Sequence, residues 1–295
     1  MQCDVVIVGG SYAGLSAAMM LARGRRDVVI LDTRTPRNRF ASHSHGFFGQ
    51  DGATPDSMLA TGRDKVLAYP TVRLLRDAAV AARGGDNAFA IDTLEHGTLA
   101  ARKVVLAYGV SDILPAIPGL AERWGKTVVH CPYCHGYELT GPQAVLAVSP
   151  MSAHQAMLIT EWGPTTLFAN GTDFDHEIVD ELRRRNVVIE RAPVTAIAGE
   201  ATVHLADGRA LPMSSLYVAT QVKPNSSLGE QLGCAFDEGR FGGYLRTDGM
   251  RATTVPGVFA AGDITRDMHN ATFATADGVM AGASAHRELV FGPHG

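Results

Sequence analysis

Residues 4–14 read DVVIVGGSYAG, a β-branched run followed by a glycine turn, and the alanine-rich stretch 15–22 that comes next is typical of a helix. In such a unit the first glycine permits the tight turn, and the last permits close packing of the helix on the strand. A pyrophosphate can then sit on free backbone N–H groups at the helix N-terminus. Gly9 and Gly14 stand in these two places, and Ser11 stands where the second glycine usually lies. The stretch predicts a dinucleotide-binding α/β domain.

Four later segments strengthen this prediction. Residues 28–31 are apolar and end in Asp32, where an acid can bind a ribose diol. Residues 103–109 form another apolar run that ends in glycine, and residues 257–263 form one that ends in glycine and an acid. Residues 270–286 are rich in small side chains, as in a helix pressed against a ligand and a sheet. We expect the chain to return to its first domain here.

Residues 130–136, near the middle of the chain, read HCPYCHG. Two cysteines separated by two residues can close a small disulfide ring, and such pairs often hold one thiol at a lowered pKa. Pro132 stiffens the ring, while His135 can exchange a proton with a thiol near neutral pH. The motif predicts a redox-active dithiol formed by Cys131 and Cys134.

Other interpretations of the same motif remain open at this point. Cys131, Cys134 and His135 also match the attachment site of a c-type haem, but the chain opens without the basic and apolar segments of a secreted protein. Zinc binding is disfavoured because His130 and His135 directly flank the pair, whereas a closed zinc site usually draws ligands from a distant part of the chain. Two buried cysteines without chemistry are the third alternative.

A second nucleotide-binding shape follows, without its binding chemistry. Residues 144–148 form an apolar strand, but residues 149–154 read SPMSAH, and none is a glycine that could admit a phosphate. Met151 would block a close pyrophosphate. Residues 169–177 are acidic and contain no arginine that could hold a 2′-phosphate. We therefore expect a second domain of this shape that does not bind NADPH.

Two loops near the first domain are rich in functional residue types. The basic loop 34–39 could contact the adenosine end of a ligand or remain solvated. Residues 43–52 contain His43 and His45, but no third metal ligand can be identified. We expect this loop to cover a bound ring system, and we expect no metal site.

Composition sets broad limits on function. The chain has 295 residues, of which 46% are hydrophobic and 19% charged, so it can form two domains. A net charge of -4 and a pI near 6.2 give no reason to expect nucleic acid or an anionic membrane as a partner. The four cysteines are too few for a secreted disulfide framework, and no apolar run approaches the roughly 20 residues that span a bilayer. We expect a cytoplasmic protein.

Residues 9–14 (GGSYAG), 131–134 (CPYC) and 257–263 (GVFAAGD) together resemble the low-molecular-weight thioredoxin reductase family over nearly the whole chain. The resemblance implies an α/β fold with two Rossmann-like dinucleotide-binding domains of the three-layer ββα type, the second inserted into the first. Residues 1–114 and 237–295 would form an FAD-binding domain. Residues 115–236 would form the inserted, NADPH-binding-like domain that carries the dithiol. A homodimer is also implied.

The resemblance further assigns roles to individual residues. Cys131 would exchange with substrate, Cys134 would face the flavin, Asp32 would bind the adenosine ribose, and Asp263 would bind the ribityl chain. The expected FAD-binding residues are Gly9, Gly10, Ser11, Ala13, Gly14, Asp32, Gly109, Gly262, Asp263, Asn270 and Ala271.

The residue after the second cysteine distinguishes two branches. The reductases carry an acid there, whereas this chain has His135, and residues 131–138 (CPYCHGYE) look more like the dithiol oxidases that close disulfides in gliotoxin and holomycin. We expect FAD-dependent oxidation of a dithiol with oxygen as acceptor, in which His135 accepts the thiol proton. The alternative is a disulfide reductase, acting on a thioredoxin-like protein, that uses NADPH weakly or a ferredoxin or flavoprotein donor. The intact dithiol disfavours a non-catalytic flavin-binding protein.

Overall fold

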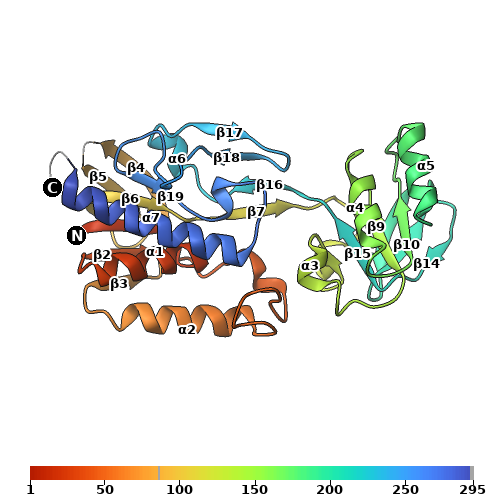
Figure 1. Ribbon diagram of the computed structural model, residues 1–295, viewed down its shortest axis with the longest axis horizontal. Coiled ribbons are helices and arrows are strands. Elements are labelled where there is room, and N and C mark those ends of the chain that lie inside the picture. The colour runs from red at the N-terminus through yellow and green to blue at the C-terminus, as the bar shows by residue number, and fades with distance from the viewer. Residues whose placement is uncertain (86, 293–295) are drawn as a thin grey trace. The chain divides into compact units, whose positions relative to one another are not determined.

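The computed structural model describes residues 1–85 and 87–292, which form two compact α/β units (Figure 1). The first comprises Met1–Arg37, Pro55–Ser111 and Val222–Gly295, and the second comprises Asn38–Thr54 and Asp112–Gln221. Within the described ranges, no helix combines the length and the apolar character that a membrane span requires.

The first unit is built on one mixed sheet with the strand order β3-β2-β1-β6-β5-β4, and β19 pairs with β6. Strands β1, β2, β3, β6 and β19 run parallel, whereas β5 runs antiparallel to both of its neighbours, β6 and β4. The strands of this sheet are β1 (Gln2–Val8), β2 (Val28–Leu31), β3 (Val72–Leu75), β4 (Ala79–Gly85), β5 (Ala88–Thr93), β6 (Thr98–Leu106) and β19 (Val258–Ala260). The other elements of the unit are α1 (Tyr12–Arg23), α2 (Pro55–Leu67), α6 (Leu228–Gln231), α7 (Ala271–Phe291), the 3-10 turn η3 (Asp263–Thr265), and the hairpin of β17 (Phe236–Glu238) and β18 (Gly243–Leu245). The 3-10 turn η1 (Arg37–Phe40) spans the division between the two units at 37/38.

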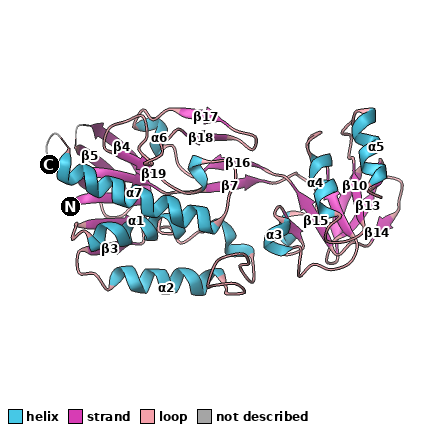
Figure 2. Ribbon diagram, in the orientation of Figure 1, coloured by secondary structure: helices cyan, strands magenta, loops and turns pink. Residues whose placement is uncertain are grey.

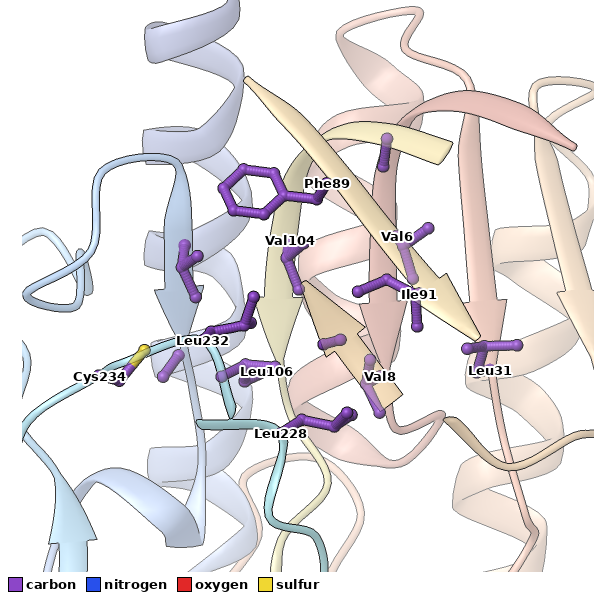
Figure 3. Packing of buried hydrophobic residues seen from close by; sticks show 14 of the residues in the cluster. Val6, Val8, Leu31, Phe89, Ile91, Val104, Leu106, Leu228, Leu232 and Cys234 are labelled. Carbon is purple, nitrogen blue, oxygen red and sulfur yellow. The ribbon is translucent and has the colours of Figure 1, made fainter. Parts of the chain in front are cut away.

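Alternate residues of β1 enter two different cores. Val5 and Ile7 pack in the core that α1 and α7 cover, while Val6 and Val8 pack in the core on the other side, with Leu228 (Figure 3). This alternation is the period of two that a strand imposes on its side chains. The sheet is therefore buried on both faces, as expected for a parallel sheet.

Helices α1 and α7 pack so closely that their backbones are in contact, because glycines of α7 face α1. A Cβ added to Gly278 would lie 2.1 Å from the Ala13 carbonyl oxygen, and one added to Gly282 would lie 2.5 Å from that of Ala17. The expected small-residue helix at 270–286 is confirmed, and it extends to Phe291.

The second unit contains a parallel sheet with the order β11-β10-β9-β15-β8 and an antiparallel sheet β12-β13-β14. One face of the parallel sheet packs on α4 and α5, and the other packs on the antiparallel sheet. In the antiparallel sheet, β13 pairs with both β12 and β14. The elements of this unit are β8 (Val128–Val129), β9 (Gln143–Leu146), β10 (Thr165–Phe168), β11 (Val188–Glu190), β12 (Val194–Ala198), β13 (Thr202–Leu205), β14 (Ala210–Leu211), β15 (Ser215–Val218), η2 (Ala121–Arg123), α3 (Pro132–His135), α4 (Ser152–Ile159) and α5 (His176–Arg184), with helices and strands distinguished in Figure 2.

The unit boundaries differ from those expected at 114/115 and 236/237. The chain passes between the units at 111/112 and 221/222, in β7 (Val110–Ile113) and β16 (Gln221–Pro224), which pair with each other. The later boundary is displaced because Leu232 and Cys234 are buried in the core of the first unit. Cys234 therefore lies inside the first unit. Residues 38–54 group with the second unit, which the sequence did not predict.

Candidate functional site

The carboxyl ends of β1, β2, β6 and β19 lie in register at one edge of the first sheet. Val8 pairs with both Leu31 and Leu106, and Leu106 pairs with Ala260, all in parallel. Open α/β sheets bind their ligands at this edge. Six of the expected cofactor residues follow these strand ends within a few positions, namely Gly9, Gly10, Asp32, Gly109, Gly262 and Asp263.

The corner between β1 and α1 requires glycine. Gly9 has φ +113°, and a Cβ there would lie 2.1 Å from the Ala107 carbonyl oxygen. A Cβ on Gly14 would lie 1.8 Å from the Gly9 carbonyl oxygen. The first backbone bond of α1 runs from the Leu15 N–H to the Ser11 carbonyl at 2.9 Å, so the N–H groups before Leu15 point out of the helix end. A pyrophosphate could thus approach the backbone closely at this corner and accept hydrogen bonds from the N–H groups at the start of α1.

Asp32 lies beside this corner and is almost buried. A Cβ on Gly10 would lie 2.6 Å from the Cβ of Asp32, which places the carboxylate next to the glycine turn. Its Oδ1 accepts a hydrogen bond from the Arg34 backbone N–H at 2.9 Å, and Oδ2 lies 3.9 Å from the Arg63 guanidinium. The sequence did not indicate Arg63, because it belongs to the separate helix α2. The carboxylate fits a ribose diol at this position.

Asp263 and the start of α7 complete this edge of the first unit. Asp263 forms an ion pair with Arg37 at 3.0 Å, and a Cβ on Gly262 would lie 3.1 Å from the Ala13 Cβ. Asn270 caps α7, because its Oδ1 accepts a hydrogen bond from the Thr272 N–H at 2.7 Å. Ala271 is the first residue of that helix. Arg37 belongs to the basic loop, and its partner is thus the acid expected at the ribityl chain.

A buried ion cluster anchors the segment after Asp263. Asp277 on α7 is 2% exposed, and its Oδ1 lies 2.7 Å from the Arg251 guanidinium and 2.5 Å from that of Arg266. Sequence reasoning missed this cluster, although an acid inside a small-residue helix is a usable signal. A buried carboxylate of this kind needs such partners.

The second unit holds the dithiol as a closed disulfide between Cys131 and Cys134. Cys131 is the N-cap of the one-turn helix α3, and Pro132 occupies its first turn, where a missing N–H costs nothing. Both cysteines are partly exposed. The helix rests on Trp162, since a Cβ on Gly136 would lie 2.7 Å from the indole Cδ1. The ring predicted from the two-residue spacing is present.

His135 is half-buried next to the disulfide. Burial lowers the pKa of its imidazole, the neighbouring Glu138 carboxylate opposes that shift, and His45 adds to it. The neutral form of His135 is therefore favoured. His130, on the other side of the disulfide, stacks on Trp124 with 5.9 Å between the ring centroids.

The corner between β9 and α4 differs from the corner in the first unit. The backbone N–H groups of Ser152, Ala153 and His154 donate to the carbonyls three residues earlier, at 3.0, 3.3 and 3.1 Å. The Ser152 hydroxyl also accepts a hydrogen bond from the Val148 N–H at 3.1 Å. Pro150 has no N–H to offer, and Met151 projects toward solvent with 43% exposure. The N–H groups of Ser152, Ala153 and His154 are thus engaged within the turn itself.

Possible metal ligands do not converge in the described ranges. Residues 1–85 and 87–292 contain no group of three or more His, Cys, Asp or Glu side chains that could hold a metal ion. His45 faces Asp51 and Glu138, and the rings of His43 and His45 are 6.4 Å apart.

Comparison with known proteins supports the expected relationship to the thioredoxin reductases. The family model described as pyridine nucleotide-disulphide oxidoreductase matches residues 3–278. The thioredoxin reductase tcpT of Claviceps purpurea is 32% identical over 304 residues, which cover 97% of this chain and 94% of the relative. Among solved structures, an oxidoreductase from Agrobacterium tumefaciens has a TM-score of 0.96 and 44% identity over 99% of both chains. The protein HlmI has a TM-score of 0.90 and 35% identity over 97% of this chain and 92% of its own. The expected family resemblance and fold class are thus confirmed, and the chain belongs to the pyridine nucleotide-disulphide oxidoreductase family as a thioredoxin reductase-like oxidoreductase.

Proposed function

We propose that this protein is an FAD-dependent dithiol oxidase, which converts a small-molecule dithiol to a disulfide through Cys131 and Cys134 with oxygen as the final acceptor. The observation that carries the proposal is the closed disulfide beside a histidine whose neutral form is favoured. A closed disulfide accepts electrons from a thiol, and a neutral imidazole accepts its proton. Both groups are in the state that dithiol oxidation requires at its start.

The edge of the first unit fits FAD as the cofactor. The pyrophosphate would lie on the N-terminus of α1, where Gly9 and Gly14 leave no room for a side chain. Asp32 would hold the adenosine ribose, and Asp263 would hold the ribityl chain. When bound, FAD would take the electron pair from the reduced cysteines and pass it to oxygen, yielding peroxide.

The chemistry of the dithiol follows from thiol–disulfide exchange. A substrate thiol loses its proton to His135, and the thiolate attacks Cys131, which breaks the bond to Cys134. The second substrate thiolate then attacks the mixed disulfide at the substrate sulfur. This releases the product disulfide and leaves Cys131 and Cys134 reduced. Two electrons are thus held as the cysteine dithiol, and the two substrate protons pass to His135 and the cysteines.

The second candidate is the reductive direction, with a thioredoxin-like protein as the partner. It is favoured by relatives named thioredoxin reductase. The engaged N–H groups at the start of α4 argue against NADPH as its donor, so a ferredoxin or another flavoprotein would have to supply the electrons. In either direction, we propose a homodimer on the strength of the family resemblance and a cytoplasmic location on the strength of the composition and the low cysteine count.

Anaerobic mixing tests the direction of the reaction. We expect a small dithiol such as dithiothreitol to bleach the flavin, and admitted oxygen to restore the yellow colour with one peroxide per dithiol. The Cys131→Ser and Cys134→Ser proteins should bind flavin but stop turnover. Fast bleaching by NADPH, without bleaching by dithiols, would return the protein to the NADPH-dependent reductases. Indifference to both would point to a protein electron donor.

A further inference from the structure

The loop 44–53 closes on itself within the second unit. Ser44 and Ala53 form an antiparallel bridge, in which the Ser44 N–H donates to the Ala53 carbonyl at 2.8 Å. The Gly46 N–H donates to Asp51 Oδ1 at 2.7 Å. Gly46 and Gly52 have φ values of +73° and +76°, which glycine adopts without strain. The loop therefore holds His45 in a defined place.

The ring of His45 lies between two carboxylates. Nδ1 is 3.6 Å from Asp51 Oδ2, and Nε2 is 3.5 Å from Glu138 Oε1. An imidazole whose two nitrogens both face carboxylates presents an N–H to each of them only as the imidazolium. The side chain is 22% exposed, so water screens these contacts only in part. The loop thus holds one ring nitrogen of His45 toward Glu138 and the other toward Asp51.

Glu138 in turn acts on His135, which it follows by one helical turn. The charged groups that act on His135 are Glu138, from its own segment, and His45, from the loop 44–53. Glu138 favours the charged form of His135, whereas His45 and burial favour the neutral form. The surroundings of His45 add Asp51 on the other side of its ring and the exposed His43. Glu138 and His45 therefore act on the pKa of His135 in opposite directions, and their side chains also face each other.

We propose that His45 is a positioning residue that offsets the charge of Glu138 and thereby keeps His135 uncharged as the proton acceptor of the dithiol. This inference rests on the proposed function for its use in catalysis, but the charge arrangement stands on its own. An isolated Glu138 carboxylate would stabilise the imidazolium of His135, which cannot accept a proton. With His45 on that carboxylate, each round of dithiol oxidation can begin with a neutral base.

Two substitutions should move His135 in opposite directions. His45→Gln removes the imidazole that faces Glu138 and that lowers the pKa of His135, so the pKa of His135 should rise. Glu138→Gln removes the anion, so the pKa of His135 should fall. NMR titration of the His135 ring in the oxidised protein measures both shifts without any turnover, and His135→Asn identifies the resonance. The pH profile of dithiol oxidation should shift with them, while the rate on its plateau changes far less than the ~10²–10⁴-fold expected for loss of the base itself.

Matched variants separate charge from shape. His43→Gln, on the same loop but exposed, should leave the His135 titration unchanged. His45→Arg keeps a cation facing Glu138 and should restore the midpoint toward that of the unmodified protein. Shifts of the same sign in His45→Gln and Glu138→Gln, or a His45→Arg protein that behaves like His45→Gln, would overturn the inference. Opposite shifts in a protein that fails to oxidise dithiols would uphold the charge arrangement and defeat the proposed function.

Discussion

The corner between β1 and α1 and the corner between β9 and α4 share the order strand, turn, helix, yet their hydrogen-bond states are opposite. In the first, Gly9 and Gly14 bring the backbones together, and the N–H groups before Leu15 point out of the helix. In the second, the N–H groups of Ser152, Ala153 and His154 donate within their own turns. The comparison teaches that this fold persists without its ligand site. Binding capacity resides in the direction of the backbone donors and in missing side chains, not in topology.

Gly14→Ala should break the first corner and have the largest effect. The added Cβ would lie 1.8 Å from the Gly9 carbonyl oxygen, and a contact that close forces the helix away from the turn. We expect the variant to purify without flavin and to lose more than about 4 kcal/mol of unfolding free energy. Absorbance of the purified protein and chemical denaturation measure the two effects.

Gly62→Ala, in the helix α2, is the matched control. A Cβ there meets only the Leu15 Cδ1, at an ordinary 3.4 Å. The flavin content should be unchanged, and stability should rise by about 0.5–1 kcal/mol because alanine loses less backbone entropy than glycine in a helix. If both alanine variants keep their flavin, the close contact at Gly14 does not govern binding.

The second corner should bind NADPH weakly. The engaged N–H groups of this corner and the absence of arginine from residues 169–177 remove several charge-assisted hydrogen bonds, each worth roughly 1.5–3 kcal/mol. Losing three of them weakens binding by about 4 kcal/mol or more, a factor above a thousand. Stopped-flow absorbance near the flavin maximum should show slow or absent bleaching by NADPH under anaerobic conditions. Rapid bleaching that saturates at micromolar NADPH would show that the second corner binds its nucleotide well, and would contradict this prediction.

The sequence could predict those features of the two corners and of the disulfide that depend on residues close together in the chain. The strand–glycine turn–helix unit at 4–22 and the disulfide ring of Cys131 and Cys134 depend on neighbours a few positions apart, so both were visible in the sequence. The missing glycines at 149–154 were visible too. What the sequence did not reveal is that Ser152 and its neighbours satisfy one another, because that depends on the backbone conformation of the turn.

Contacts between distant segments were the part that could not be predicted. Arg37 and Asp263 are 226 positions apart, and His45 meets Glu138 from a loop that the sequence assigned to a ligand. The resemblance also implied a boundary at 236/237, whereas burial places Cys234 inside the first unit. Such pairings depend on where whole loops come to lie, and no local pattern encodes this.

Asp32→Ala sharpens the comparison between Asp32, which follows β2 in the first unit, and Asn170, which follows β10 in the second. Removing the carboxylate beside Gly10 should cost the hydrogen bonds to the ribose, about 1.5–3 kcal/mol, or roughly tenfold to a hundredfold in flavin affinity. The matched change is Asn170→Ala after β10, where the amide oxygen accepts a hydrogen bond from the Val194 N–H at 3.0 Å. It should lower stability without altering flavin affinity. Equilibrium dialysis against FAD distinguishes the two variants, and equal affinity losses would refute the assignment of Asp32.

Ser152→Ala should produce the smallest effect, and it probes the second corner directly. The hydroxyl accepts a hydrogen bond from the Val148 N–H at 3.1 Å, and Ser152 is 1% exposed, so its removal leaves a backbone donor without that partner. A loss of about 1 kcal/mol in unfolding free energy follows, as for other hydroxyls that satisfy a backbone N–H at a helix start. Ser149→Ala, which keeps its carbonyl bonded to the Ser152 N–H, should cost less. Flavin content and NADPH bleaching should stay unchanged in both variants, because the bond serves the fold alone. If Ser152→Ala instead speeds bleaching by NADPH, the freed donor at Val148 takes part in nucleotide binding, and the second corner is a closed site rather than a lost one.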